Sequence, residues 1–215
     1  MGRLSGTRIA IVTAHEFEDI ELLVPVVRFS EEGAEVTVAT LPKGAAGGAH
    51  FSPRGYDPDK PITGRFGSTI PLVVLQEGLR WHHKEIPDLA IEDYDAVVLP
   101  GGFAPDYLRL DESTLTFVAD MYGAGKLVAA ICHGPQILIS VDANRDTDLV
   151  RGRDVTCYAA VRDDLRNAGG NFLEVPAVVS GNVITGRCPD DLPDFCRAII
   201  DHLAGEVSDG VYQLD

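Results

Sequence analysis

The chain has 215 residues, of which 45% are hydrophobic and 24% charged, which excludes a disordered protein and suits a folded α/β domain. Eighteen basic residues against 33 acidic ones give a net charge of −15, so a nucleic-acid backbone or an anionic lipid surface is an unfavourable partner. No apolar run approaches the ~20 residues that a membrane-spanning helix needs. We therefore expect a cytoplasmic protein with no nucleic-acid and no membrane partner.

The first part of the chain alternates between predicted strands and a helix. Arg8–Ala14 is a short apolar, β-branched run that indicates a buried strand, and Glu35–Thr40 has the alternation of a second strand. Between them, Glu18–Glu32 carries apolar residues at helical spacing. From residue 41 to about residue 68 the chain is rich in Gly and Pro and has no period, which predicts a long loop insertion.

Regular alternation resumes after this insertion. Further strands are predicted at Ile70–Leu75, Ala96–Leu99, Leu127–Ile131, Val155–Tyr158, Ala177–Ser180 and Val183–Thr185. Helices are predicted at Glu112–Tyr122, from Gly134 to Ser140, and at about Leu192–Leu203. Continuous apolar strands that alternate with helices are typical of a parallel sheet covered on both faces. The prediction is one doubly wound, flavodoxin-like α/β domain over residues 1–215.

The segment Lys126–Ser140, KLVAAICHGPQILIS, places Cys132 on a tight turn between a buried strand and a helix. This arrangement is the cysteine form of the nucleophile elbow. The N-terminus of the following helix stabilises negative charge, and backbone N–H groups at such a turn can bind an oxyanion. These features favour Cys132 as a nucleophile over a buried structural cysteine. The other cysteines, Cys157, Cys188 and Cys196, show no CxxC spacing and are expected to be free thiols.

Two kinds of group are candidates for activating Cys132: the adjacent His133, and a carboxylate from another loop. A glutamine amidotransferase pairs such a cysteine with a late His-x-Glu, but the late His202 is followed here by Leu203 and Ala204. Because Cys132 meets a helix N-terminus and His133, we expect its pKa to lie well below the ~8.5 of a free thiol.

Three segments together point to a known family. They are Ala14–Leu22 (AHEFEDIEL), Leu99–Arg109 (LPGGFAPDYLR) and Ala130–Ser140 (AICHGPQILIS). The set resembles the signature segments of PfpI-type proteins in the DJ-1/PfpI superfamily of intracellular proteases, glyoxalases and deglycases. The resemblance spans about residues 8–203; it is specific to the superfamily and does not fix a substrate.

The resemblance implies roles for particular residues. Cys132 corresponds to the family nucleophile, and His133 to the histidine beside it. Glu18 corresponds to the carboxyl group that hydrogen-bonds the thiol, and facing a thiolate it should be protonated. The Gly101–Gly102 turn corresponds to the backbone that faces the oxyanion. Asp106 corresponds to an acid that orients the histidine from a neighbouring subunit, which implies a homo-oligomer with shared active sites.

Three further residues are candidates for the pocket wall. Tyr158 aligns with a tyrosine that lines the family pocket. His15 stands where relatives often have Asn. Cys188 lies at a strand end that approaches the pocket in this fold. Asp106 itself is one methylene shorter than the glutamate usual in PfpI-type relatives.

The implied activity is that of a cofactor-free cysteine enzyme of the glyoxalase or deglycase type, in which a Cys132 thiolate adds to a small reactive carbonyl. One alternative is an intracellular cysteine peptidase or amidase, which would form an acyl-enzyme from a peptide or amide substrate. A second alternative is a redox sensor or stress chaperone that needs only an oxidisable thiol. The cluster of His82, His83 and Glu85, with His50, fits solvated histidines better than ligands, so no metal is expected.

Overall fold

The computed structural model describes residues 2–42, 61–70, 81–206 and 209–213. Its main sheet contains β1 (Arg8–Thr13), β2 (Glu35–Thr40), β5 (Trp81–Glu85), β6 (Ala96–Leu99), β7 (Leu127–Ile131), β10 (Ala177–Ser180), β11 (Val183–Gly186) and β12 (Gly210–Tyr212). The strand order is β12-β10-β11-β7-β6-β1-β2-β5. Neighbouring strands from β11 to β5 are parallel, and β10 is antiparallel to both β11 and β12.

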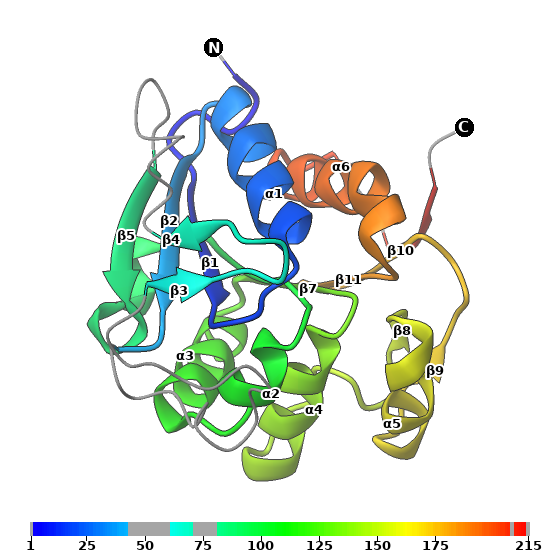
Figure 1. Ribbon diagram of the computed structural model, residues 1–215. Coiled ribbons are helices and arrows are strands. Elements are labelled where there is room, and N and C mark those ends of the chain that lie inside the picture. Colours follow the sequence, from blue (N-terminus) through cyan, green and yellow to red (C-terminus); the bar gives the residue numbers. More distant parts are fainter. Residues whose placement is uncertain (1, 43–60, 71–80, 207–208, 214–215) are drawn as a thin grey trace.

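Helices cover both faces of this sheet. They are α1 (Asp19–Glu31), α2 (Ala104–Leu108), α3 (Glu112–Gly123), α4 (Pro135–Asn144), α5 (Arg162–Asn167) and α6 (Leu192–Leu203). Figure 1 shows α1 and α6 together on one side, and α2, α3 and α4 on the other. The predicted doubly wound α/β fold is therefore confirmed, with an antiparallel strand near one edge.

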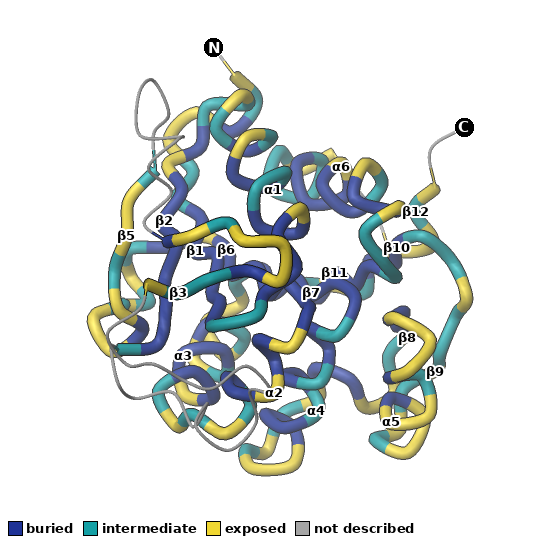
Figure 2. Tube along the Cα trace, viewed as in Figure 1, coloured by how far each residue is buried: buried dark blue, intermediate teal, exposed yellow. Residues whose placement is uncertain are grey.

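The core lies where the central strands meet the two helical layers. Every residue of β6 and β7 is buried, and β1 is buried beyond Arg8, as the dark strands of Figure 2 show. Their side chains are mostly Ala, Val, Ile and Leu, which pack well on a pleated sheet. Each fully buried Val, Ile or Leu contributes about 1.5–3 kcal/mol of transfer free energy. This burial fixes the positions at which β1, β6 and β7 end.

Two small sheets lie outside the main one. β3 (Ile62–Thr63) and β4 (Thr69–Ile70) form an antiparallel hairpin, and β8 (Asp154–Val155) pairs in parallel with β9 (Asn171–Phe172). Residues 61–68 therefore contain a strand and a turn, although the sequence predicted a loop there. Residues 43–60 of that loop lie outside the described part of the chain.

Other differences from the sequence-based expectations concern strands. Of the expected strand Ile70–Leu75 only Ile70 is described, and the expected strand Val155–Tyr158 ends at Val155. β5 was not expected, because four of the five residues in its sequence WHHKE are polar and it lies at the edge of the sheet. The candidate metal cluster His82–Glu85 is thus part of an edge strand, and His50 lies outside the described residues.

Within the described ranges, no group of three or more His, Cys, Asp or Glu side chains could hold a metal ion. Nor does any helix there have the length and apolarity to cross a membrane.

Candidate active site

Four loops meet at one edge of the sheet, beyond the carboxyl ends of parallel strands. β11, β7, β6 and β1 are consecutive neighbours in the sheet. The residues that follow them are Ala14–Glu18 after β1, Pro100–Phe103 after β6, Cys132–Gly134 after β7 and Arg187–Asp191 after β11. Ligands of open α/β sheets bind at this edge. The three segments singled out in the sequence therefore lie together in space.

Cys132 occupies a strained turn between β7 and α4. Its φ angle is +62°, a left-handed conformation that a non-glycine residue rarely adopts. The turn is held by bonds from Cys132 N–H to the Gly186 carbonyl at 3.0 Å and from Gly134 N–H to the Ile131 carbonyl at 2.8 Å. A Cβ on Gly134 would lie 2.3 Å from the Leu99 carbonyl oxygen, so glycine is required there. The predicted elbow is confirmed.

The Cys132 sulfur is surrounded by hydrogen-bonding groups although its residue is only 5% exposed. His133 Nδ1 lies 3.3 Å from Sγ. The backbone N–H groups of Gly102 and His133 both donate to the sulfur, and the Glu21 carboxyl group shares a side-chain hydrogen bond with it. Two N–H donors that converge on a nucleophile are also placed to hold an oxyanion formed beside it.

The carboxyl group that contacts the thiol belongs to Glu21, whereas the resemblance pointed to Glu18. Glu21 is fully buried, and its Oε2 accepts a bond from Gly101 N–H at 2.7 Å. Glu18 has a different partner: its Oε2 accepts a bond from Arg65 Nη1 at 2.8 Å. The physical reason is the phase of α1: Glu18 precedes the helix, and Glu21 lies on its buried face, one turn before Pro25.

The pKa values of Cys132 and Glu21 are both raised, whereas a thiol at a helix N-terminus was expected to have a lowered pKa. Burial raises the pKa of Cys132, and the Glu21 carboxylate raises it further, against the two backbone N–H donors. Burial likewise raises the pKa of Glu21 to about 7. The expected low pKa of Cys132 taken alone is therefore contradicted.

The two groups titrate together as one unit. Above about pH 7 the pair carries a single negative charge and keeps one proton between the carboxyl group and the sulfur. Glu21 Oε1 is buried, and it has no hydrogen-bond partner among the described residues. An oxygen in that situation is well suited to carry a proton and to donate it to the sulfur. Glu21, and not Glu18, is therefore the carboxyl group that is coupled to the Cys132 thiol.

His133 lies beside the thiol as a neutral imidazole. Burial lowers its pKa, the Asp106 carboxylate acts in the opposite direction, and the Arg65 charge adds to the lowering. Its ring packs against Tyr158 with centroids 5.0 Å apart, and Tyr158 N–H donates to the Cys132 carbonyl at 3.0 Å. Asp106 is exposed on α2, and its charge acts on His133 of the same chain. The histidine is thus already under the influence of an acid from its own chain.

Gly101 and Gly102 allow the loop after β6 to approach both α1 and the elbow. A Cβ on Gly101 would lie 2.8 Å from both Glu21 Oε2 and His133 N. Gly102 has φ +77°, and a Cβ there would lie 2.4 Å from the backbone nitrogen of Glu18. Both contacts are with groups that hold the site together, so both positions require glycine.

Replacing Gly102 with Ala should therefore destabilise the fold. Gly125 is a matched control, because it has φ +74° and a Cβ added there would meet no atom within 4 Å. Gly125→Ala should cost about 1 kcal/mol from the left-handed backbone alone. Gly102→Ala should cost about 2 kcal/mol more because its contacts are backbone. Urea unfolding measures both; equal losses would show that the close approach of this loop is not a constraint.

The other two predicted pocket residues hold neighbouring loops. His15 is half-buried, and its Nδ1 accepts a bond from Thr63 N–H at 3.3 Å. Cys188 donates its thiol proton to Asp191 Oδ2 at 3.0 Å, and Asp191 also forms a two-pronged pair with Arg187 at 2.8 and 3.0 Å. The described contacts thus direct the Cys188 thiol towards Asp191.

Sequence reasoning missed two residues of this site, Glu21 and Arg65. Glu21 had a usable signal, since it is spaced four residues before Pro25 and eight before Phe29 on the buried helix face. Arg65 had none, because it lies in the turn of the β3–β4 hairpin, inside the segment without a period.

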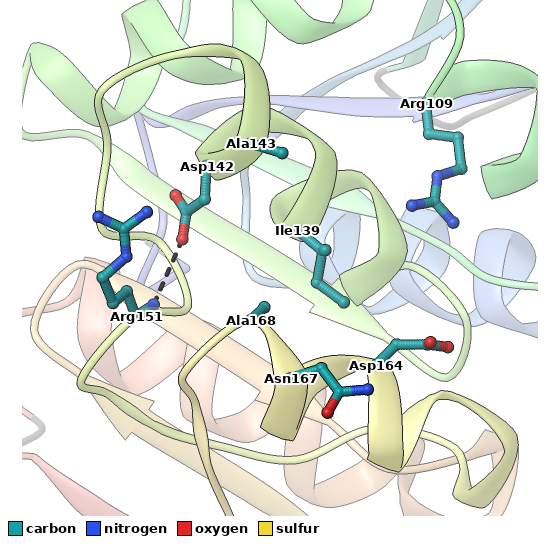
Figure 3. Close-up of a pocket in the computed structure, with 8 residues that line it drawn as sticks. All are labelled: Arg109, Ile139, Asp142, Ala143, Arg151, Asp164, Asn167 and Ala168. Carbon is teal, nitrogen blue, oxygen red and sulfur yellow. Dashed lines mark hydrogen bonds between the residues drawn. The ribbon is translucent and has the colours of Figure 1, made fainter.

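A separate pocket of about 500 Å³ between α4 and α5 contains none of the predicted site residues (Figure 3). Its lining includes Arg109, Asp142, Arg151 and Asp164.

Comparison with known proteins relates this chain to the members of one family. A family model described as the DJ-1/PfpI family matches residues 7–202. Deglycase PfpI of Pyrococcus furiosus is 37% identical over 193 residues, which cover 90% of this chain and 97% of that protein. A Bacillus subtilis protein named "Putative cysteine protease YraA" is 38% identical over 190 residues, which cover 88% of this chain and 94% of that one.

Solved structures agree on the fold. A two-domain protein from Anabaena variabilis, with DJ-1/ThiJ/PfpI-like and ferritin-like domains, superimposes with a TM-score of 0.73 at 33% identity. The match covers 94% of this chain, which spans half of that longer protein. Drosophila melanogaster DJ-1beta superimposes with a TM-score of 0.72 at 23% identity, covering 95% of this chain and 92% of that one.

Proposed function

The chain belongs to the DJ-1/PfpI family, and we propose that it is a cofactor-free cysteine enzyme that acts on small reactive carbonyls. The observation that carries the proposal is the elbow at Cys132, where a buried thiol in a left-handed turn lies 3.3 Å from His133 Nδ1. The buried Glu21 carboxyl group lies beside it, since a Cβ on Gly101 would contact both Glu21 Oε2 and the Cys132 side chain. A carbonyl carbon needs a nucleophile, its oxygen needs donors, and the adduct needs a proton. The name deglycase, carried by a relative at 37% identity, adds support.

The proposed chemistry on a 2-oxoaldehyde such as methylglyoxal proceeds in balanced steps. The Cys132 thiolate forms an S–C bond to the aldehyde carbon, and the carbonyl oxygen takes the proton held by Glu21, giving a hemithioacetal. The Glu21 carboxylate or the neutral His133 then removes the C–H proton and returns it to the adjacent carbon. The hydroxyl proton moves at the same time to the ketone oxygen of that adjacent carbon, giving the thioester of a 2-hydroxyacid. Water cleaves the S–C bond and restores the thiol, so one aldehyde and one water give one hydroxyacid.

An amidase or peptidase reaction is the second candidate, favoured by the relative named as a cysteine protease and by the same N–H donors. In that case Cys132 would form an acyl-enzyme and the N–H groups of Gly102 and His133 would hold the oxyanion. A sensor or chaperone role is the third alternative and requires only that the thiol be oxidisable.

A substrate panel separates these candidates. Methylglyoxal without glutathione and a chromogenic amino-acid amide are each incubated with the wild type and with Cys132→Ala. We expect hydroxyacid formation from the aldehyde by the wild type alone. Release of the chromophore with no aldehyde turnover would support the amidase instead. Turnover of neither substrate would refute both the carbonyl reaction and the amidase reaction.

We propose further that the active unit is a homo-oligomer in which Asp106 acts on His133 of a neighbouring chain. Its support is the match to the family acid and the exposed position of Asp106 on α2. Light scattering should then give at least a dimer, and Asp106→Ala should lower turnover. Mixing Asp106→Ala chains with Cys132→Ala chains should restore part of the activity, because some pairs assemble a complete site. A fully active monomer, or no restoration of activity on mixing, would contradict the shared site. The acid that acts on His133 would then be Asp106 of the same chain.

A further inference from the structure

The β3–β4 hairpin is fastened to the active-site loop rather than lying freely on the surface. The buried Asp19 carboxylate accepts bonds from the N–H groups of Phe66 and Ser68, both at 2.8 Å. Arg65 N–H donates to the Phe17 carbonyl at 3.0 Å, and Glu16 N–H to the Thr63 carbonyl at 2.8 Å. These bonds join the hairpin to the turn between β1 and α1, which carries Glu18 and leads to Glu21.

The turn of this hairpin presents one positive charge to the Cys132 site. Arg65 donates from Nη1 to Glu18 at 2.8 Å, and its guanidinium lies 5.1 Å from the ring centroid of Phe103 and 5.8 Å from that of Phe66. Its charge reaches the site, because it opposes the rise in the pKa of Glu21 and adds to the lowering of the pKa of His133. The Arg65 side chain is 39% exposed, so its other donors remain open to solvent.

A positive charge at this position has a consequence for substrate choice. The chain carries a net charge of −15, which repels small anions from most of its surface. A guanidinium that lies near two rings and bonds one carboxylate is restricted in orientation, and its planar donors suit a further carboxylate. Phe66 and Phe103 are 77% and 49% exposed, so an entering molecule would meet apolar ring surface beside the cation.

We propose that Arg65 is a specificity-determining residue that directs the Cys132 site towards electrophiles carrying a carboxylate. The anion would accept bonds from the N–H donors of the guanidinium that Glu18 leaves open, and its electrophilic carbon would be brought to the sulfur. This rests on the proposed function for the carbonyl itself, but preference for an anion can be measured without any turnover.

Two alkylating agents of nearly the same size provide the test. Iodoacetate carries a carboxylate and iodoacetamide a neutral amide; in both reactions the Cys132 thiolate forms an S–CH₂ bond and iodide leaves. The ratio of the two rates, measured on the peptide that contains Cys132 by mass spectrometry, isolates the effect of the anionic charge. Any change in thiol ionisation affects both reagents equally and cancels in the ratio.

Arg65→Gln should lower the iodoacetate-to-iodoacetamide ratio about tenfold, because it removes one charge near the site. Arg65→Lys should retain most of the ratio. Arg28→Gln is the matched control: Arg28 is also paired with glutamates, Glu31 and Glu32, but lies nine residues beyond Asp19, about 13 Å along α1. It should leave the ratio unchanged.

An unchanged ratio in Arg65→Gln, or an equal fall in Arg28→Gln, would overturn the inference. Its failure is distinguishable from failure of the proposed function. A wild type that converts no aldehyde, yet shows an Arg65-dependent ratio, would refute the carbonyl reaction and support the anion preference.

Discussion

Cys132→Ala should lower carbonyl turnover by about 10³-fold or more while leaving the fold intact. In the proposed chemistry the sulfur is the protein atom that forms a covalent bond to a carbon of the substrate, and alanine has no atom that can replace it as nucleophile. The elbow backbone is held by bonds from Cys132 N–H to Gly186 and from Gly134 N–H to Ile131, and alanine keeps them. Turnover and urea unfolding of the same preparation measure the two effects separately.

Cys196→Ala is the control for this prediction. Cys196 is also buried, but it lies within α6 rather than at a strand-to-helix turn, and burial raises its pKa against the charge of Arg28. A buried thiol in a helix interior is structural and unreactive. Its replacement should leave turnover within about twofold of the wild type. Activity that survives in Cys132→Ala would contradict the proposed reaction and favour a role that does not need this nucleophile.

Glu21→Gln should raise stability at neutral pH while lowering activity. The folded-state pKa of Glu21 is raised to about 7, so the folded protein binds more protons than the unfolded chain between its usual value and 7. Stability from this group is therefore greatest at low pH and is lost as the pH rises through that window. The loss amounts to about 3 kcal/mol. Glutamine does not titrate and can still accept from Gly101 N–H, so the variant should escape this loss.

Urea unfolding at pH 5 and pH 8 tests the stability part. The wild type should lose stability from pH 5 to pH 8 by up to about 3 kcal/mol more than Glu21→Gln does. Turnover of the variant at pH 7 should fall about 10- to 100-fold, because glutamine can donate to the thiolate but cannot take the thiol proton. Glu18→Gln removes the neighbouring carboxylate, which pairs with Arg65, and should keep most of the pH dependence. If Glu18→Gln abolishes the pH dependence and Glu21→Gln does not, Glu18 is the partner of the thiol.

The parts of the fold that sequence predicted best are those fixed by local pattern. β1, β6 and β7 are short, continuous apolar runs, and each is found within one residue of its expected bounds. The elbow at Cys132 was predictable because a buried strand, small residues and a helix start follow one another within fifteen residues. Local pattern was misleading for β5, because the run of four polar residues on this edge strand resembles a solvated segment.

The parts that sequence did not predict depend on contacts between distant segments or on helix phase. The choice between Glu18 and Glu21 turns on where α1 begins, and a shift of one residue rotates every side chain by about 100°. Arg65 reaches Glu18 across 47 positions of the chain, through a hairpin fixed by Asp19. The raised pKa values follow from burial, which no spacing of residues in the sequence reveals.

The pH dependence of Cys132 alkylation by iodoacetamide tests most directly whether the thiol and Glu21 share one ionisation. In the wild type the rate should rise through an inflection near pH 7, where the pair loses its first proton. In Glu21→Gln the ionisation that the pair shows near pH 7 is absent, and the inflection should move to higher pH, because burial raises the pKa of the thiol that then ionises alone. A wild-type inflection at the ~8.5 of a free thiol, unchanged in Glu21→Gln, would contradict the account.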